Sequence, residues 1–217
     1  MKYSSHSTYY NKKGVEVVSA TSVLKILNKP SLSKWANFLG FKRQNIDQVL
    51  KESSEKGTLI HEAINCYIFN KIFIYVPKDE YEKYMLKQTL DKFITWYKNA
   101  DFKPIFGEKQ MSCEKFGGTV DLYCELDGKK TILDFKSSKA FYSTMFLQLA
   151  GYTYMMEQNG YEIDQVCIML INENYCRTKI ISRDQLDEYI NTFLLLVELY
   201  YKVYDINLEW RDLLDIK

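Results

Sequence analysis

The dipeptide Asp127-Gly128 constrains the fold most, because it separates two segments that each read as a strand. Segments 118–126 and 130–137 alternate between faces and are rich in β-branched and aromatic residues. An Asp-Gly pair between such segments is a strong signal for a two-residue hairpin. With these two residues as the turn, Leu126 faces Lys129, and the register of every further pair follows.

This register places Asp121 directly opposite Asp134. Opposed side chains have β-carbons about 4.5–5.5 Å apart, so two carboxylates there repel each other. A shared proton, a salt bridge or a divalent cation would neutralise them. Lys136 points to the same face as Asp134 and could form the salt bridge, or orient or deprotonate a water on a cation. The simpler alternative is a solvated Asp–Lys–Asp cluster. The opposite face is expected to anchor the hairpin in the core through Val120, Leu122, Leu133 and Phe135.

In the remaining chain, apolar residues recur mainly at helical spacing before the hairpin, and at both helical and alternating strand spacing after it. Helices are predicted over 19–27, 31–40, about 53–71, 79–99, 143 to about 158, and 182 to about 203. Ser182 and Gln185 form a capping-box pattern at the start of the last helix. Further strands are predicted over 15–18, 105–115, 165–171 and 175–181. The order of elements predicts an α/β fold with a mixed central β-sheet flanked by helices.

The length of 217 residues suits a single domain. We expect a basic N-terminal helical segment over 1–56, a core over 57–182 and a C-terminal helix over 183–217. The first segment holds ten Lys/Arg against four Asp/Glu. This excess favours contact with a polyanion such as DNA, although a solvated lysine-rich face has the same composition.

Cysteine usage and hydropathy bear on the compartment. Five cysteines, odd in number and never in a CxxC arrangement, are expected to be reduced thiols without a zinc or iron–sulfur site. No stretch approaches a membrane span, and the polar start lacks the apolar core of a signal peptide. We therefore expect a cytoplasmic protein, in the host cytoplasm if phage-encoded, with no membrane contact.

Three motifs in this order, GGTVDLY (117–123), ILDFKSS (132–138) and QLAGYTY (148–154), resemble those of the PD-(D/E)XK nuclease superfamily with its restriction-endonuclease-like core. The chain is most similar to RecB-like and phage-type exonucleases, including the mitochondrial genome-maintenance exonucleases. Segment 56–64, KGTLIHEAI, resembles the helix that supplies a histidine metal ligand in RecB-like nucleases. Segment 18–36 resembles the opening of phage exonucleases.

The resemblance implies roles for individual residues. Asp121, Asp134, His61 and the carbonyl of Phe135 would hold one or two Mg²⁺ or Mn²⁺ ions, and Lys136 would orient or activate the attacking water. Additional expected residues are Gln148 on the water or a phosphate, and, as further candidates, Glu108 and Tyr152. The simpler alternatives are that His61 is a hydrogen-bonded structural residue, Glu108 a charge on an edge strand and Gln148 a polar residue on a helix. The four cysteines of iron–sulfur relatives have no match, so no iron–sulfur cluster is expected.

These residues together predict a metal-dependent deoxyribonuclease, an exonuclease of recombination, replication or end processing, as in phages. The DNA backbone is expected to contact Lys34, Lys42, Arg43 and Lys139, and Trp35 is the candidate for stacking on single-stranded DNA. Helicase motifs are absent, so unwinding would need a helicase, single-strand-annealing or replication partner. Two alternatives stay open. An endonuclease of the same fold would cut closed circles, and a catalytically silent DNA-binding or scaffold module would cut nothing.

Overall fold

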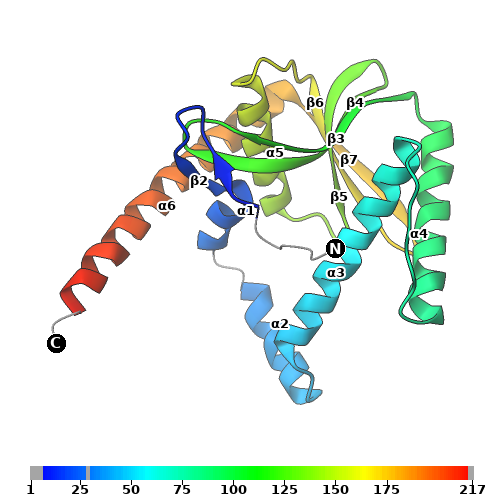
Figure 1. The fold of residues 1–217 in the computed structure, drawn as a ribbon, viewed down its shortest axis with the longest axis horizontal. Coiled ribbons are helices and arrows are strands. Elements are labelled where there is room, and N and C mark those ends of the chain that lie inside the picture. Colours follow the sequence, from blue (N-terminus) through cyan, green and yellow to red (C-terminus); the bar gives the residue numbers. More distant parts are fainter. Residues whose placement is uncertain (1–6, 28–29, 215–217) are drawn as a thin grey trace.

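The structure is a computed structural model that describes residues 7–27 and 30–214. A seven-stranded mixed sheet lies at its centre, with helices on both faces (Figure 1). This confirms the predicted α/β fold class. In the described part of the chain, no helix is both long and apolar enough to cross a membrane.

The elements follow the predicted order along the chain. They are β1 (Tyr9–Tyr10), β2 (Glu16–Ser19), α1 (Ala20–Val23), the 3-10 helix η1 (Leu24–Ile26), α2 (Pro30–Phe41), α3 (Ile46–Ile68), α4 (Glu80–Asn99), β3 (Phe102–Ser112), β4 (Phe116–Leu126), β5 (Lys129–Lys136), α5 (Ser143–Glu157), β6 (Gln165–Ile171), β7 (Cys176–Ser182), η2 (Arg183–Leu186) and α6 (Asp187–Leu214).

Strand β1 was not predicted, and several boundaries differ from the sequence prediction, among them both ends of β3, which spans Phe102–Ser112 and not 105–115. Helix α3 begins at Ile46, where Asn45 accepts a hydrogen bond from the Gln48 N–H; Ile46, Val49 and Leu50 stand at helical spacing in its first turns, a signal that the sequence prediction missed. The capping box at Ser182 is wrong, because this side chain makes no cap hydrogen bond and a 3-10 turn precedes α6. Helix α6 also continues to Leu214, well past the predicted end.

The hairpin forms in the predicted register. Leu126 pairs with Lys129, and the ladder between β4 and β5 continues to Leu122 and Leu133. Strand β5 then pairs in parallel with β6, and β6 pairs antiparallel with β7. These pairings make β5 an interior strand, which explains its near-continuous burial.

Strand β4 pairs with three strands, so two of them, β2 and β5, lie along the same edge of β4. Strand β3 pairs along one edge of β4 over its full length. On the other edge β2 pairs in parallel with Phe116 and Gly117, while β5 pairs from Leu122 onward. Residues 118–121 have no strand partner on this second edge in the described structure. The sheet therefore opens at the point where Asp121 lies.

Two apolar clusters sandwich the sheet. Helices α1, α5 and α6 cover one face, around Ile132, Val166 and Phe193. Helices α3 and α4 cover the other, around Ile64, Phe93 and residues of the strands that include Leu122, Leu133 and Phe135. The expectation that Val120 shares a face with these three residues is wrong, because Val120 packs in the α5-side cluster. Side-chain alternation is thus interrupted at Asp121, beside the opening of the sheet.

Candidate active site

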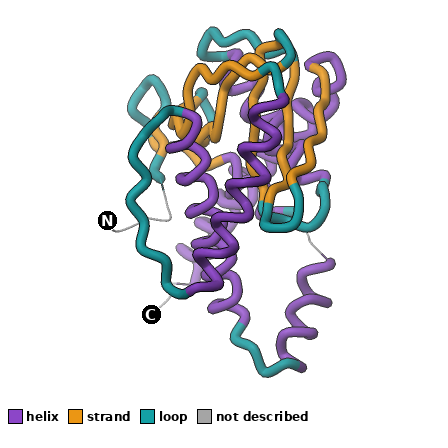
Figure 2. Tube along the Cα trace, turned by 90° about the vertical axis from the view of Figure 1, so that its right-hand side faces the viewer, coloured by secondary structure: helices purple, strands orange, loops and turns teal. Residues whose placement is uncertain are grey.

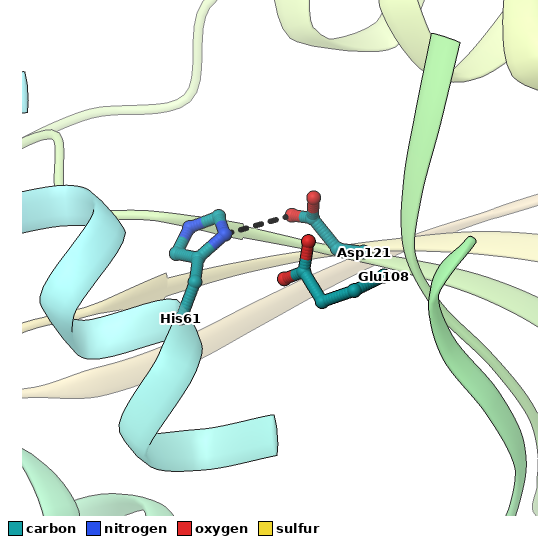
Figure 3. A group of neighbouring side chains, drawn as sticks. All are labelled: His61, Glu108 and Asp121. Atoms are coloured by element: carbon teal, nitrogen blue, oxygen red, sulfur yellow. Dashed lines mark ion pairs between the residues drawn. The ribbon is translucent and has the colours of Figure 1, made fainter. Parts of the chain in front are cut away.

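Three metal-ligating side chains meet at the opening of the sheet. His61 from α3, Glu108 from β3 and Asp121 from β4 point toward one another, as Figure 3 shows. One ligand atom of each lies within 4.8 Å of the others, and His61 Nδ1 is 3.4 Å from Asp121 Oδ2. A mixed imidazole–carboxylate group of this kind suits a divalent cation such as Mg²⁺ or Mn²⁺.

Helix α3 fixes the position of His61. Ile60 and Ile64 on either side of it are buried in the α3–α4 cluster, so this part of the helix cannot rotate without loss of packing. The imidazole also contacts the ring of Phe135 edge to face at 5.6 Å. The structure thus brings His61 beside Asp121.

Glu108 reaches the site through irregular backbone. Strand β3 carries a register shift between Pro104 and Phe106, and Glu108 itself has φ +50, an uncommon conformation for a residue other than glycine. It lies between the pairs Gly107–Leu122 and Lys109–Val120, and is therefore opposite Asp121. Desolvation by surrounding protein atoms and the Asp121 carboxylate raise the pKa of Glu108 to about 7.

Asp134 and Lys136 form a buried ion pair next to this group. Lys136 Nζ lies 2.6 Å from Asp134 Oδ2, and the Asp134 side chain is only 2% exposed. Neither carboxylate oxygen makes a hydrogen bond of good geometry among the described residues. Burial raises the pKa of Asp134 to about 6, with Lys136 opposing the shift and Asp121 adding to it. A buried carboxylate with free acceptor capacity is the kind of group that binds a cation.

The charge on Lys136 is stabilised by its neighbours. Burial alone would lower its pKa, but the carboxylates of Asp134 and Asp121 outweigh this effect and raise it. Without a cation, the amine is therefore protonated at neutral pH. This state is opposite to the lowered pKa that a general base requires.

Asp121 does not pair directly with Asp134 in the ladder, although the predicted register places the two residues opposite each other. Regular pairing ends at Leu122 and Leu133, and the Asp121 carboxylate instead accepts a hydrogen bond from the Phe135 N–H at 3.0 Å. Asp121 thus lies between His61 and β5. Its charge still acts on Asp134, which shows that the two carboxylates share one electrostatic environment.

Tyr152 and Gln148 from α5 form the floor of the opening. Gln148 Nε2 donates a hydrogen bond to Tyr152 Oη at 2.9 Å, and Tyr152 is almost fully buried. Burial, followed by the charges of Asp134 and Asp121, holds the pKa of Tyr152 well above its usual value, so its hydroxyl stays neutral. The pair can therefore supply hydrogen bonds but no charge.

The two glycines of the GGTVDLY motif admit tyrosine rings. A β-carbon on Gly118 would collide with the ring of Tyr152, and one on Gly117 with the ring of Tyr9. Tyr9 Oη is also hydrogen-bonded to Thr119 Oγ1 at 2.9 Å. The approaching groups are two side chains, one of which lines the site.

The predicted DNA-contacting residues lie on and just after α2, and in the loop after β5. Trp35 and Lys34 are on α2, and Lys42 and Arg43 follow at its end. Lys139 lies in the loop after β5, where its carbonyl accepts a hydrogen bond from Arg177 Nη2. Lys34, Lys42, Arg43 and Lys139 are exposed and Trp35 is half-buried. Sequence reasoning did not single out Phe38 and Phe41, the two exposed phenylalanines of α2.

Comparison with known proteins gives distant likenesses of fold. No protein-family model and no curated protein matches the chain. Among solved structures, SSO0001 resembles it with a TM-score of 0.40 and 13% identity, over 88% of this chain and 79% of that chain. A phage related exonuclease from Haemophilus somnus 129PT resembles it with a TM-score of 0.38 and 15% identity, over 88% of this chain and 96% of that chain. LHK-Exo in complex with dAMP resembles it with a TM-score of 0.34 and 10% identity, over 88% of this chain and 94% of that chain.

Proposed function

We propose that the chain is a divalent-metal-dependent deoxyribonuclease that hydrolyses phosphodiester bonds, and that it acts as an exonuclease on DNA ends. The observation that carries this proposal is the convergence of His61, Glu108 and Asp121 beside the buried Asp134–Lys136 pair. These groups come from α3 and three adjacent strands. They meet where the sheet opens, so a phosphate group could approach them.

The residues present fit a divalent cation. Asp134 is a buried carboxylate with unused acceptor capacity, and desolvation, with a contribution from the Asp121 charge, raises the pKa values of Glu108 and Asp134 to about 7 and about 6. His61, Glu108, Asp121 and Asp134, with the Phe135 carbonyl, would hold one or two Mg²⁺ or Mn²⁺ ions. When bound, such an ion supplies Lewis acidity to the phosphate and lowers the pKa of a coordinated water.

Lys136 would act mainly through its charge. Its raised pKa keeps a proton on Nζ, so the ammonium can hold the attacking water by a hydrogen bond and stabilise negative charge that develops on the phosphate. Gln148, fixed by Tyr152, retains its amide oxygen and one N–H for the same water or for a phosphate oxygen. Both residues would therefore orient the reactants.

The biological setting is proposed from the motifs and the fold together. Roles in recombination, replication or end processing would require DNA ends, and unwinding of duplex DNA would need a helicase, annealing or replication partner. The basic residues of the first 56 positions and Lys139 would bind the DNA backbone, so affinity should fall as salt increases. A single domain and a cytoplasmic location stay predictions.

The test is cleavage of end-labelled linear single strands, linear duplex and closed circles in Mg²⁺ or Mn²⁺, with Asp134→Ala and Lys136→Ala beside wild type. We expect release of mononucleotides or short products from linear DNA, and a loss of more than about 100-fold in either variant, because changes outside the ligand set already cost up to that factor. Equal activity in all three proteins would disprove the assigned site.

The same assay separates the alternatives. Cutting of closed circles would identify an endonuclease of this fold. Absence of cleavage on every substrate with both metals, together with retained DNA binding, would identify a silent binding module.

A further inference from the structure

Helix α2 and the first half of α3 form a helical hairpin that projects from the body of the molecule, as both ribbon views show (Figures 1 and 2). Helix α2 packs on α3, and Leu39 is buried on its inner side. The face of α2 that carries Phe38 and Phe41 has unusually exposed apolar groups, since these two side chains are 53% and 91% exposed.

Positive charge surrounds these rings. Between Pro30 and Arg43 the sequence has three basic residues and no acidic one. Lys42 Nζ lies 4.5 Å from the centre of the Phe38 ring. An aromatic face beside an ammonium group can take one nucleotide, because the ring stacks on the base and the ammonium neutralises the phosphate. A purely apolar protein partner would gain nothing from these charges.

We propose that the outer face of α2, with Phe38, Phe41 and Lys42, is a stacking surface for single-stranded DNA that extends from the active site. This inference rests on the proposed nuclease function and names its substrate: a DNA single strand or single-stranded tail. Bases in a duplex are stacked on each other and offer no free face to the rings. Trp35 is half-buried and contributes less.

The length of α3 sets the distance between this surface and the site. Ile46, where the projecting hairpin turns, precedes His61 by fifteen residues on one continuous helix, which corresponds to about 22 Å. A strand stacked as in a duplex, with about 3.4 Å per nucleotide, needs roughly six nucleotides to cover that distance, and an extended single strand, with about twice that spacing, needs roughly three. Short oligonucleotides can therefore reach the active site without reaching Phe41.

The test compares wild type with the Phe38→Ala/Phe41→Ala variant. Dissociation constants are measured by fluorescence anisotropy in EDTA for labelled oligothymidines of about two and about twenty nucleotides and for a blunt duplex. We expect the long single strand to bind about tenfold more weakly or worse, and the other two to change less than about twofold. Leu195→Ala, on the exposed side of α6, is the matched control with no expected effect.

Cleavage assays separate this inference from the proposed function. With metal present, the variant should cleave the short oligonucleotide at the wild-type rate and show a raised KM only for the long one. Phe41→Trp should retain tight binding of the long strand. Equal weakening on the duplex, or no change on any DNA, would overturn the inference. A change in self-association by sedimentation with unchanged DNA binding would assign the surface to a second copy of the chain.

Discussion

At the scale of single residues, the site combines desolvated carboxylates with one ammonium group. Glu108 and Asp134 have pKa values raised to about 7 and about 6, while Lys136 remains protonated. Groups with strongly shifted pKa values in one opening are typical of functional sites. Their electrostatic cost in the folded chain gives a direct prediction for Glu108.

Replacing Glu108 by Gln should stabilise the metal-free protein in a pH-dependent way. The folded state binds the Glu108 proton more tightly than the unfolded state, because its pKa is about 7 instead of 4.5. Stability is therefore lost as pH rises through this window, and Glu108→Gln removes that loss. In EDTA the melting temperature of the variant should match wild type near pH 4.5 and exceed it at pH 8.

Bound metal should oppose the advantage of Glu108→Gln in melting temperature, because Glu108 is a proposed metal ligand. A ligand that binds the folded state at 100 times its Kd adds about 2.7 kcal/mol of stability. Excess Mn²⁺ at pH 8 should therefore raise the melting temperature of wild type more than that of Glu108→Gln. A difference between the two proteins that does not change with pH or Mn²⁺ would show that Glu108 is an ordinary surface charge.

Gly118 is the second residue with a sharp prediction. A β-carbon here would collide with the buried ring of Tyr152, which has no room to move away. Gly118→Ala should destabilise the chain by about 1–3 kcal/mol in urea unfolding. Gly40→Ala is the control: no atom lies near its added carbon, so it should stabilise α2 by about 0.5–1 kcal/mol. The double variant Gly118→Ala/Tyr152→Leu should lose less than the sum of the single changes, and strict additivity would refute the contact.

At the scale of elements, the β6–β7 hairpin holds the loop that follows Lys136. Tyr175 Oη donates to the Ser138 carbonyl at 3.0 Å, and Arg177 Nη2 donates to the Lys139 carbonyl at 3.0 Å. The Arg177 guanidinium also stacks on the Tyr175 ring at 4.3 Å. The two side chains thus fix the loop from one side.

Removing one of these hydrogen bonds should loosen the end of β5. We expect Tyr175→Phe to cost about 0.5–1.5 kcal/mol of stability and to lower kcat several-fold, because the position of Lys136 depends on the loop. The measurement is kcat on a short oligonucleotide, with Thr178→Ala, an exposed change on the same strand, as control. A kcat equal to wild type in Tyr175→Phe would show that the loop does not position Lys136.

Most elements could be predicted from the sequence because their signals are local. The hairpin register follows from two turn residues, and His61 follows from its place on an amphipathic helix. Strand β1 was missed because two residues carry no period; it exists through its pairing with β2. The start of α3 was missed although Ile46, Val49 and Leu50 stand at helical spacing there and Asn45 caps the helix.

At the scale of the whole molecule, the site depends on pairings that no local pattern encodes. Strands β2 and β5 share one edge of β4, and the gap they leave frees Asp121 from the ladder. The place of Glu108 depends on a register shift in β3 and a positive φ. The sequence therefore predicted which residues belong together, and could not predict that Asp121 turns toward His61 and Phe135.

The central claim is that this shared edge of β4 is a metal centre, and Mn²⁺ binding measured by electron paramagnetic resonance tests it most directly. Wild type should remove free Mn²⁺ signal with one or two sites per chain, and Asp121→Asn should weaken binding by more than about tenfold. Leu195→Ala, remote on α6, should bind as wild type does. Saturable binding that is unchanged in Asp121→Asn, or no binding in wild type, would contradict the account.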